Sequence, residues 1–395
     1  MGTRMSMGMR SQTVPQVERQ LDRDRLARIV DAEDVSEVPF DTLVGWFQAE
    51  VQESLPDGVA QTDPRNGDRV IFCPARGRRP HDYDDYDAEV ERHQPHPADA
   101  ATREAACIIC QGRTTRVVDV AALSTGFTFI NKNLYPIVHP GPHRPAETPT
   151  SAGRPVVGLH FVQWTSSQHD RDWHNMPPAD CTIVMERLAA LEEYLLTNSM
   201  PLFTLPILLD EHEQRYVSII KNYGRLVGGS LAHPHQQIWV SNIAPRRVAE
   251  HRRFQAEHGE TFSAYLLREN PAELLVRDYG PAVLIVPYFM RRPYDMMLLM
   301  KDSRKAYLHE LNAEEISAAA MGWHDALRAI RAIMPRIGRE LAYNVVTHNG
   351  AGAGLYFEFL PYVQEIGGAE HLGLFICQGE PYSAAGQIRR CLTTG

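Results

Sequence analysis

Two histidines lie two residues apart in the stretch His233-Pro234-His235-Gln236-Gln237, which runs directly into Ile238-Trp239-Val240. On an extended segment, residues two apart project from the same face, so both imidazoles can reach one site. One could bind a metal at the edge of that site while the other faces a substrate. Taken alone, the same five residues also fit a strand that carries two ordinary histidines.

A loop of mostly small residues precedes the histidines, with the sequence KNYGRLVGGSLA at residues 221–232. Such a loop lets a phosphate approach the backbone, and a neighbouring histidine can then attack phosphorus and hold it covalently. Imidazole is largely neutral near pH 7 and is therefore nucleophilic. Donors from the loop and from Gln237 would stabilise charge on phosphorus. Because an amide cannot protonate a leaving group, Gln237 favours leaving groups that are already good, such as a sugar phosphate.

Cys107 and Cys110 are the only closely spaced pair among the six cysteines, and C-x-x-C is the spacing of a zinc knuckle. A redox pair and two core cysteines are the alternatives for this pair alone. Two more ligands are needed for a tetrahedral ion, and His169 and His233 are the candidates. Four such ligands would close the coordination shell, so the metal would be structural.

The run Arg76-Gly77-Arg78-Arg79-Pro80 follows a short apolar strand pattern. Arginine offers planar, bidentate donors that suit phosphate oxygens. The simpler interpretation, a solvated basic turn, is favoured when this run is taken alone.

Composition excludes several classes of protein. The 395 residues are 44% hydrophobic and 23% charged, which is typical of a globular protein. A net charge of −9 argues against a general nucleic-acid binder. No apolar run is long enough for a membrane span, and the polar N-terminal segment predicts no signal peptide. We therefore expect a cytoplasmic protein without nucleic-acid or membrane partners.

The elements that must position these residues occur in a repeated order of helix, strand, loop and strand. The first copy comprises residues 179–197, 216–220, the glycine loop and 233–240, and the second comprises 313–334, 342–347, 348–354 and 355–363. Asn312 and Glu315 are a plausible N-cap pair for the second helix. The pattern predicts a duplicated α+β unit, and only the first copy carries the two histidines.

Four segments in this order resemble the galactose-1-phosphate uridylyltransferase branch of the histidine-triad superfamily. They are Thr62–Pro80, with its arginine turn, Cys107–Gly112, Ser166–Asp170, and Asn222 through Gly228-Gly229-Ser230 into Gln237. Residues 283–300 and 342–352 are similar to the second half of that family. The resemblance covers roughly residues 62–390, and the combination is far more specific than any single motif.

The resemblance implies duplicated histidine-triad-like halves, each an antiparallel sheet with helices. Residues 1–60 would be a tail with an amphipathic segment, 61–245 the catalytic half with the zinc knuckle, and 246–395 a half without the paired histidines. His235 would form a covalent nucleotidyl-histidine, and Gln237 would bond a phosphate oxygen. Cys107, Cys110, His169 and His233 would hold structural zinc. The implied substrate-binding residues are Arg76, Arg79, Asn131, Asn222, Gly228, Gly229 and Ser230.

Two departures from the family pattern affect the second half. Tyr356-Phe357-Glu358 replaces a histidine-rich motif. A second metal held by His251, His348 and Glu358 is one interpretation. The favoured interpretation is that these are three unrelated polar residues. The segment Gly367–Phe375 differs from galactose enzymes and is closer to a glycine-rich version in relatives with other acceptors. The base and the acceptor therefore stay open.

The leading hypothesis is a nucleotidyltransferase that moves a nucleoside monophosphate between a nucleoside diphosphate sugar and a sugar 1-phosphate through His235. A phosphorylase or hydrolase that acts on an ADP-sugar or a dinucleoside polyphosphate is the second hypothesis. The third is a non-catalytic nucleotide-binding protein. The resemblance also implies a homodimer, because active sites in the family are shared between subunits.

Overall fold

The structure is a computed structural model that describes residues 21–49, 58–73, 76, 104, 106–141, 153–198 and 215–393. The strands are β1 (Val59–Thr62), β2 (Arg69–Phe72), β3 (Val117–Ala122), β4 (Phe127–Lys132), β5 (Arg154–Pro155), β6 (Gly158–Trp164), β7 (Tyr216–Tyr223), β8 (His235–Ser241), β9 (Leu275–Asp278), β10 (Ala282–Ile285), β11 (Met296–Met300), β12 (Tyr343–His348) and β13 (Tyr356–Pro361). The α-helices are α1 (Arg23–Leu26), α2 (Phe40–Ala49), α5 (Pro178–Thr197), α6 (Arg246–His258), α7 (Phe262–Glu269), α8 (Ala313–Arg336), α9 (Gly368–His371) and α10 (Pro381–Thr393). Two of the short 3-10 helices are η4 (Arg225–Val227) and η6 (Leu308–Glu310).

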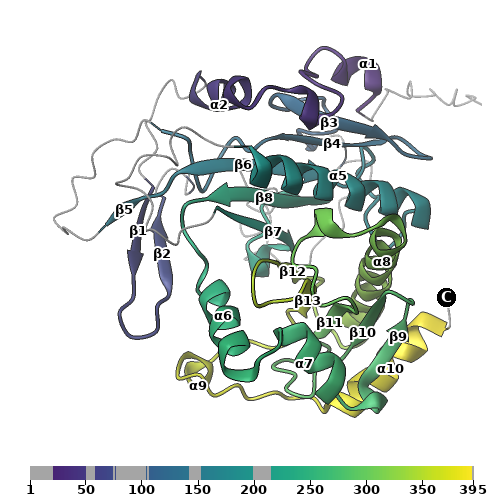
Figure 1. Cartoon of the computed structure of the whole chain (residues 1–395). Helices are drawn as coiled ribbons and strands as arrows, with labels where there is room; N and C mark the ends of the chain where they lie inside the picture. Colours follow the sequence, from purple (N-terminus) through teal and green to yellow (C-terminus); the bar gives the residue numbers. More distant parts are fainter. Residues whose placement is uncertain are drawn as a thin grey trace, which may run out of the picture.

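One large antiparallel sheet runs through the molecule, with the strand order β3-β4-β6-β8-β7-β12-β13-β11-β10-β9 (Figure 1). A small sheet, β2-β1-β5, lies to one side of it. The large sheet consists of two sets of strands, β3-β4-β6-β8-β7 and β9-β10-β11-β13-β12, which have the same order and meet where β7 pairs with β12. Each set has one long helix at the same point in the chain, α5 before β7 and α8 before β12. The predicted α+β class is confirmed, and the repeated strand order is a duplication in topology.

The two long helices begin and end close to where the sequence pattern predicts them. Pro178 stands in the first turn of α5, where its missing N–H leaves no hydrogen bond unmade. At the start of α8, the Asn312 side chain accepts from the Glu315 N–H at 3.0 Å, and the Glu315 carboxylate accepts from the Asn312 N–H at 2.7 Å. This capping box satisfies two backbone donors that the helix leaves unpaired.

The main hydrophobic core lies between the sheet and the helices α5 and α8, which pack against each other. Trp323 of α8 contacts Phe357 and Phe359 of β13 edge-on, and it also contacts Trp173 from the first half with ring centroids 4.9 Å apart. Because side chains alternate along a strand, this packing places the intervening Glu358 on the opposite face of the sheet. The face that carries His235 and Gln237 is likewise the one turned away from the helices.

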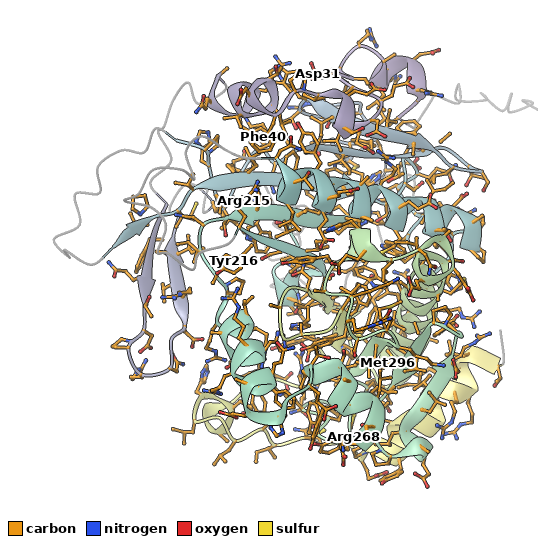
Figure 2. All side chains as sticks on the ribbon, viewed as in Figure 1. Asp31, Phe40, Arg215, Tyr216, Arg268 and Met296 are labelled. Atoms are coloured by element: carbon orange, nitrogen blue, oxygen red, sulfur yellow. The ribbon has the colours of Figure 1, made fainter. Side chains whose placement is uncertain are left out.

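Residues 21–49 pack against the edge of the first half. Val30 forms a bridge with Val117 of β3, and the carbonyl of Phe47 is bonded by the buried Lys132 and His139 side chains. Asp31 and Phe40 lie above this end of the sheet in Figure 2. The described part of the chain contains no helix that is both long and apolar enough to span a membrane.

Candidate active site

Four side chains from three segments form a compact group of possible metal ligands. The ligand atoms of Cys107, Cys110, His169 and His233 all lie within 4.8 Å of one another. Nδ1 of His233 is 3.7 Å from the sulfur of Cys107 and 3.5 Å from that of Cys110, which is also 3.5 Å from Nδ1 of His169. The sequence named these four residues as ligands, and the fold places them together.

The donor set and its spacing fit a tetrahedral zinc ion. Zinc bond lengths put a sulfur and a nitrogen ligand about 3.6 Å apart, which matches the separations in this group. A hydrogen bond from Cys110, with others from the two histidines, lowers the pKa of the Cys107 thiol, and this favours the thiolate that binds metal. Nε2 of His233 lies 2.8 Å from the carbonyl oxygen of Ser166, which orients the ring so that Nδ1 faces the sulfurs.

The first residue of β8, His235, has a fixed ring orientation. Its Nδ1 lies 2.9 Å from the carbonyl oxygen of His233. A carbonyl only accepts hydrogen bonds, so Nδ1 carries the proton and Nε2 keeps a lone pair. Burial lowers the pKa of His235 to about 4; the bond to His233 opposes this shift, and the charge of Lys221 adds to it. The ring is therefore neutral at pH 7 and has a nucleophilic nitrogen.

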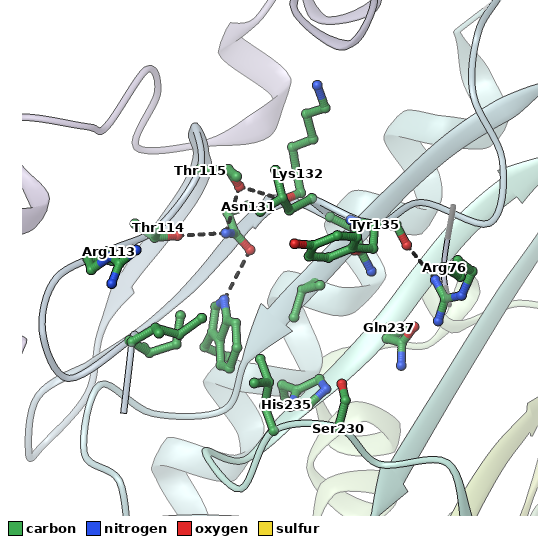
Figure 3. Close-up of a pocket in the computed structure, with 17 residues that line it drawn as sticks. Arg76, Arg113, Thr114, Thr115, Asn131, Lys132, Tyr135, Ser230, His235 and Gln237 are labelled. Carbon is green, nitrogen blue, oxygen red and sulfur yellow. Dashed lines mark hydrogen bonds between the residues drawn. The ribbon is translucent and has the colours of Figure 1, made fainter. Parts of the chain in front are cut away.

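A cavity of about 470 Å³ opens beside His235 (Figure 3). Ser230 and Gln237 lie next to the imidazole, and Arg76 reaches in from the other side, where its guanidinium donates to the carbonyl of Tyr135 at 2.5 Å. Ile108 of the knuckle and Leu231 of the loop add apolar walls. Of the predicted site residues, Arg76, Asn131, Ser230, His235 and Gln237 line this cavity.

The Asn131 amide lines the cavity and is hydrogen-bonded to three neighbouring side chains. It donates to the hydroxyls of Thr114 and Thr115 at 2.6 and 2.9 Å, and its oxygen accepts from the indole of Trp164 at 3.0 Å (Figure 3). Trp164 also packs against His235, with ring centroids 5.0 Å apart. Sequence analysis missed Trp164 and both threonines, although each lies within three residues of a predicted element or motif.

The remaining predicted residues of the loop do not line the cavity. Ile220 of β7 lies opposite Gln237 of β8. Asn222 is two residues further along β7, so it lies opposite His235 and on the same face of the sheet. Gly228 has a left-handed backbone with φ +83°, and a Cβ on Gly229 would lie 2.8 Å from the carbonyl oxygen of Gly224. This tight turn is why the loop needs glycine. Arg79 lies outside the described residues.

Behind β8, on the helix side of the sheet, an ion pair is buried that the sequence did not reveal. The ammonium group of Lys221 lies 3.0 Å from the carboxylate of Asp172, and neither side chain is exposed by more than 1%. The same ammonium donates to the carbonyl oxygen of His235 at 3.2 Å. The start of β8 is thus held from the helix side of the sheet.

The three residues considered for a second metal have other partners. His348 pairs with Glu358 at 2.7 Å, whereas Nε2 of His251 lies 2.9 Å from the hydroxyl of Tyr356. Although burial opposes it, the charge of His348 lowers the pKa of Glu358 to about 2. Within the described residues, only the Cys107 group brings three or more ligand atoms close enough to hold an ion.

The match to a known family agrees with this geometry. The family model for the N-terminal domain of galactose-1-phosphate uridyl transferase matches residues 54–245, the region that holds the cysteine knuckle, the glycine loop and His235. Residues 54–245 therefore form a domain of the galactose-1-phosphate uridyl transferase family.

Curated relatives of the chain include enzymes of two activities. The galactose-1-phosphate uridylyltransferase of Kluyveromyces lactis is 23% identical over 259 residues, which are 61% of this chain and 65% of the relative. The ADP-glucose phosphorylase of Arabidopsis thaliana is 21% identical over 299 residues, 72% of this chain and 76% of the relative. The chain thus spans just under two thirds of the first relative and about three quarters of the second.

Solved structures share the fold of this chain. A uridylyltransferase structure matches with a TM-score of 0.64 at 21% identity, covering 85% of this chain and 99% of that one. The Arabidopsis thaliana ADP-glucose phosphorylase with bound ADP-glucose matches with a TM-score of 0.56 at 17% identity, covering 84% and 98%. The fold is therefore common to proteins that are named for two different activities.

Proposed function

We propose that this protein is a nucleotidyltransferase that moves a nucleoside monophosphate between two phosphate-bearing molecules through His235. The supporting observation is the neutral imidazole of His235, whose Nδ1 is fixed by the carbonyl of His233 and whose ring borders a cavity of nucleotide size. Nε2 attacks the α-phosphorus of a nucleoside diphosphate sugar, and the bond from that phosphorus to the bridging oxygen breaks. The sugar 1-phosphate leaves with the electron pair, and in the second step a phosphate oxygen of the acceptor displaces His235.

Several residues around the cavity have a role in this proposal. Gln237, Ser230 and Asn222 donate hydrogen bonds to the oxygens of the reacting phosphate, and Arg76 neutralises a second phosphate. Zinc, when held by Cys107, Cys110, His169 and His233, supplies a cross-link that fixes the start of β8. Because the leaving phosphate is already a stable anion, no acid is needed, which suits an amide at position 237.

The acceptor distinguishes two candidate functions. A sugar 1-phosphate acceptor gives a uridylyltransferase-like exchange, as the name of the Kluyveromyces lactis relative describes for that protein. Inorganic phosphate gives a phosphorylase, and the similarity to the Arabidopsis thaliana ADP-glucose phosphorylase is the observation that favours it. Both use the same first half-reaction. We also propose that the protein is a cytoplasmic homodimer.

Product analysis separates the two candidates. The purified protein is incubated with UDP-glucose or ADP-glucose and with either galactose 1-phosphate or inorganic phosphate. A new nucleoside diphosphate sugar formed only with the sugar phosphate supports the transferase. Free nucleoside diphosphate formed with inorganic phosphate supports the phosphorylase. If neither product forms from either donor, both candidates are wrong.

A further inference from the structure

A side chain of β12, in the C-terminal half, contacts the strand and the loop beside His235. Asn344 lies directly opposite Asn222 in the antiparallel pairing of β12 with β7. Its Nδ2 donates to the side-chain oxygen of Asn222 at 2.7 Å and to the carbonyl oxygen of Val227 at 3.1 Å. Val227 ends the 3-10 turn just before Gly228, Gly229 and Ser230. Asn344 therefore holds both the strand and the glycine loop that flank His235.

The donors and acceptors assign the orientation of both amides. The carbonyl of Val227 can only accept, so Asn344 must turn its NH2 group toward the loop. The second hydrogen of that NH2 group then requires an acceptor, so Asn222 must present its oxygen to Asn344. With its oxygen taken, Asn222 keeps its own NH2 group as the donor for the site. A backbone carbonyl thus fixes, through Asn344, which end of Asn222 is available.

We propose that Asn344 is a positioning residue that keeps the amide NH2 of Asn222 turned toward the phosphate of the substrate. This inference rests on the proposed function, because it assigns Asn222 a phosphate oxygen as its partner. Asn222 lies level with His235 on the same face of the sheet, where a donor to the reacting phosphate is useful. The role of Asn344 also connects the half of the molecule that lacks the paired histidines to the site.

The isosteric variant Asn344→Asp tests this role because it keeps the side-chain shape and reverses its polarity. A carboxylate cannot donate to Val227, and it draws the NH2 group of Asn222 away from the site. Asn222 would then present its oxygen to a phosphate oxygen. We expect covalent labelling of His235 by a nucleoside diphosphate sugar to slow about 10- to 100-fold, the range for one hydrogen bond to a charged group.

Asn270→Asp is the matched control. Asn270 lies in the same half, its NH2 group donates to the carbonyl of Val286 at 3.2 Å, and its oxygen accepts from the Tyr288 N–H at 2.9 Å. The substitution likewise removes an amide donor to a backbone carbonyl, but outside β7, β12 and the glycine loop. We expect Asn270→Asp to lower the melting temperature by a similar amount and to leave the labelling rate within about twofold of wild type.

A double-mutant cycle with Asn222→Ala provides the decisive measurement. If Asn344 acts through Asn222, the double variant Asn344→Asp/Asn222→Ala is labelled less than about threefold more slowly than Asn222→Ala alone. The inference is wrong if Asn344→Asp labels as fast as Asn270→Asp, or if its full effect persists without the Asn222 amide. A wild-type protein that no donor labels contradicts the proposed function instead, so the two failures are distinct.

Discussion

Lys221 and Asp172 form a completely buried ion pair, with 3.0 Å between the ammonium nitrogen and a carboxylate oxygen. Four segments meet at this pair, because Lys221 also bonds the carbonyl of His235 and the hydroxyl of Tyr343 donates to Asp172 at 3.3 Å. Tyr343 precedes Asn344 on β12 and faces the other side of the sheet. One short stretch of the C-terminal half thus supports the active-site half on both faces.

Breaking this ion pair should lower the free energy of unfolding. Lys221→Met leaves Asp172 buried without its counter-charge, and we expect the free energy of unfolding to fall by about 3–5 kcal/mol. The variant Lys221→Met/Asp172→Asn removes both charges and should recover a large part of that loss. Urea unfolding of both variants provides the measurement. A double variant that is less stable than Lys221→Met would contradict the assignment of a coupled pair.

Zinc should be bound stoichiometrically and should stabilise the fold. We expect about one zinc per chain in the purified protein and its loss in Cys110→Ser, with a lower melting temperature that added zinc does not restore. Cys377→Ser is the control, since that half-buried thiol lies outside the metal-ligand group and bonds the carbonyl of Gly379. Equal zinc contents in the two variants, measured by elemental analysis, would show that the cysteine group is not the metal site.

The contact between His309 and Glu192 should make stability depend on pH. Nδ1 of His309 lies 3.0 Å from the buried carboxylate of Glu192, which joins η6 of the second half to α5 of the first. The hydrogen bond to Glu192 raises the pKa of His309 above its usual 6.5. The stabilisation is therefore fully present below pH 6.5 and is lost as pH rises through the raised value.

His309→Gln tests this dependence. The melting temperature of the wild type should exceed that of the variant by more at pH 6 than at pH 9. A difference that stays constant, or grows toward high pH, would mean that protonation of His309 does not contribute.

Features carried by neighbouring residues could be predicted from the sequence. The capping box at Asn312 and Glu315, the helix at 179–197 and the repeated order of elements all follow from local spacing, and the structure contains each of them. Sequence also placed Cys107, Cys110, His169 and His233 in one group, but it did so through resemblance to a family. Spacing alone left a redox pair or two core cysteines open.

Features that depend on pairing across the fold could not be predicted in this way. A lysine inside a strand is ordinarily exposed, so nothing at position 221 indicates a partner 49 residues earlier. Asn344 likewise became informative only once the register set it opposite Asn222. The second-metal interpretation identified three residues that lie near one another, His251, His348 and Glu358. However, Nε2 of His251 is hydrogen-bonded to the hydroxyl of Tyr356.

The most direct test of the account is the intact mass of the protein after incubation with nucleoside diphosphate sugars and dinucleoside polyphosphates. We predict an acid-labile gain of one nucleoside monophosphate in the wild type and none in His235→Ala, with the added mass naming the base. The adduct should disappear when the matching acceptor is added. Donor binding measured by calorimetry without any adduct, or an adduct that persists in His235→Ala, would contradict covalent transfer through His235.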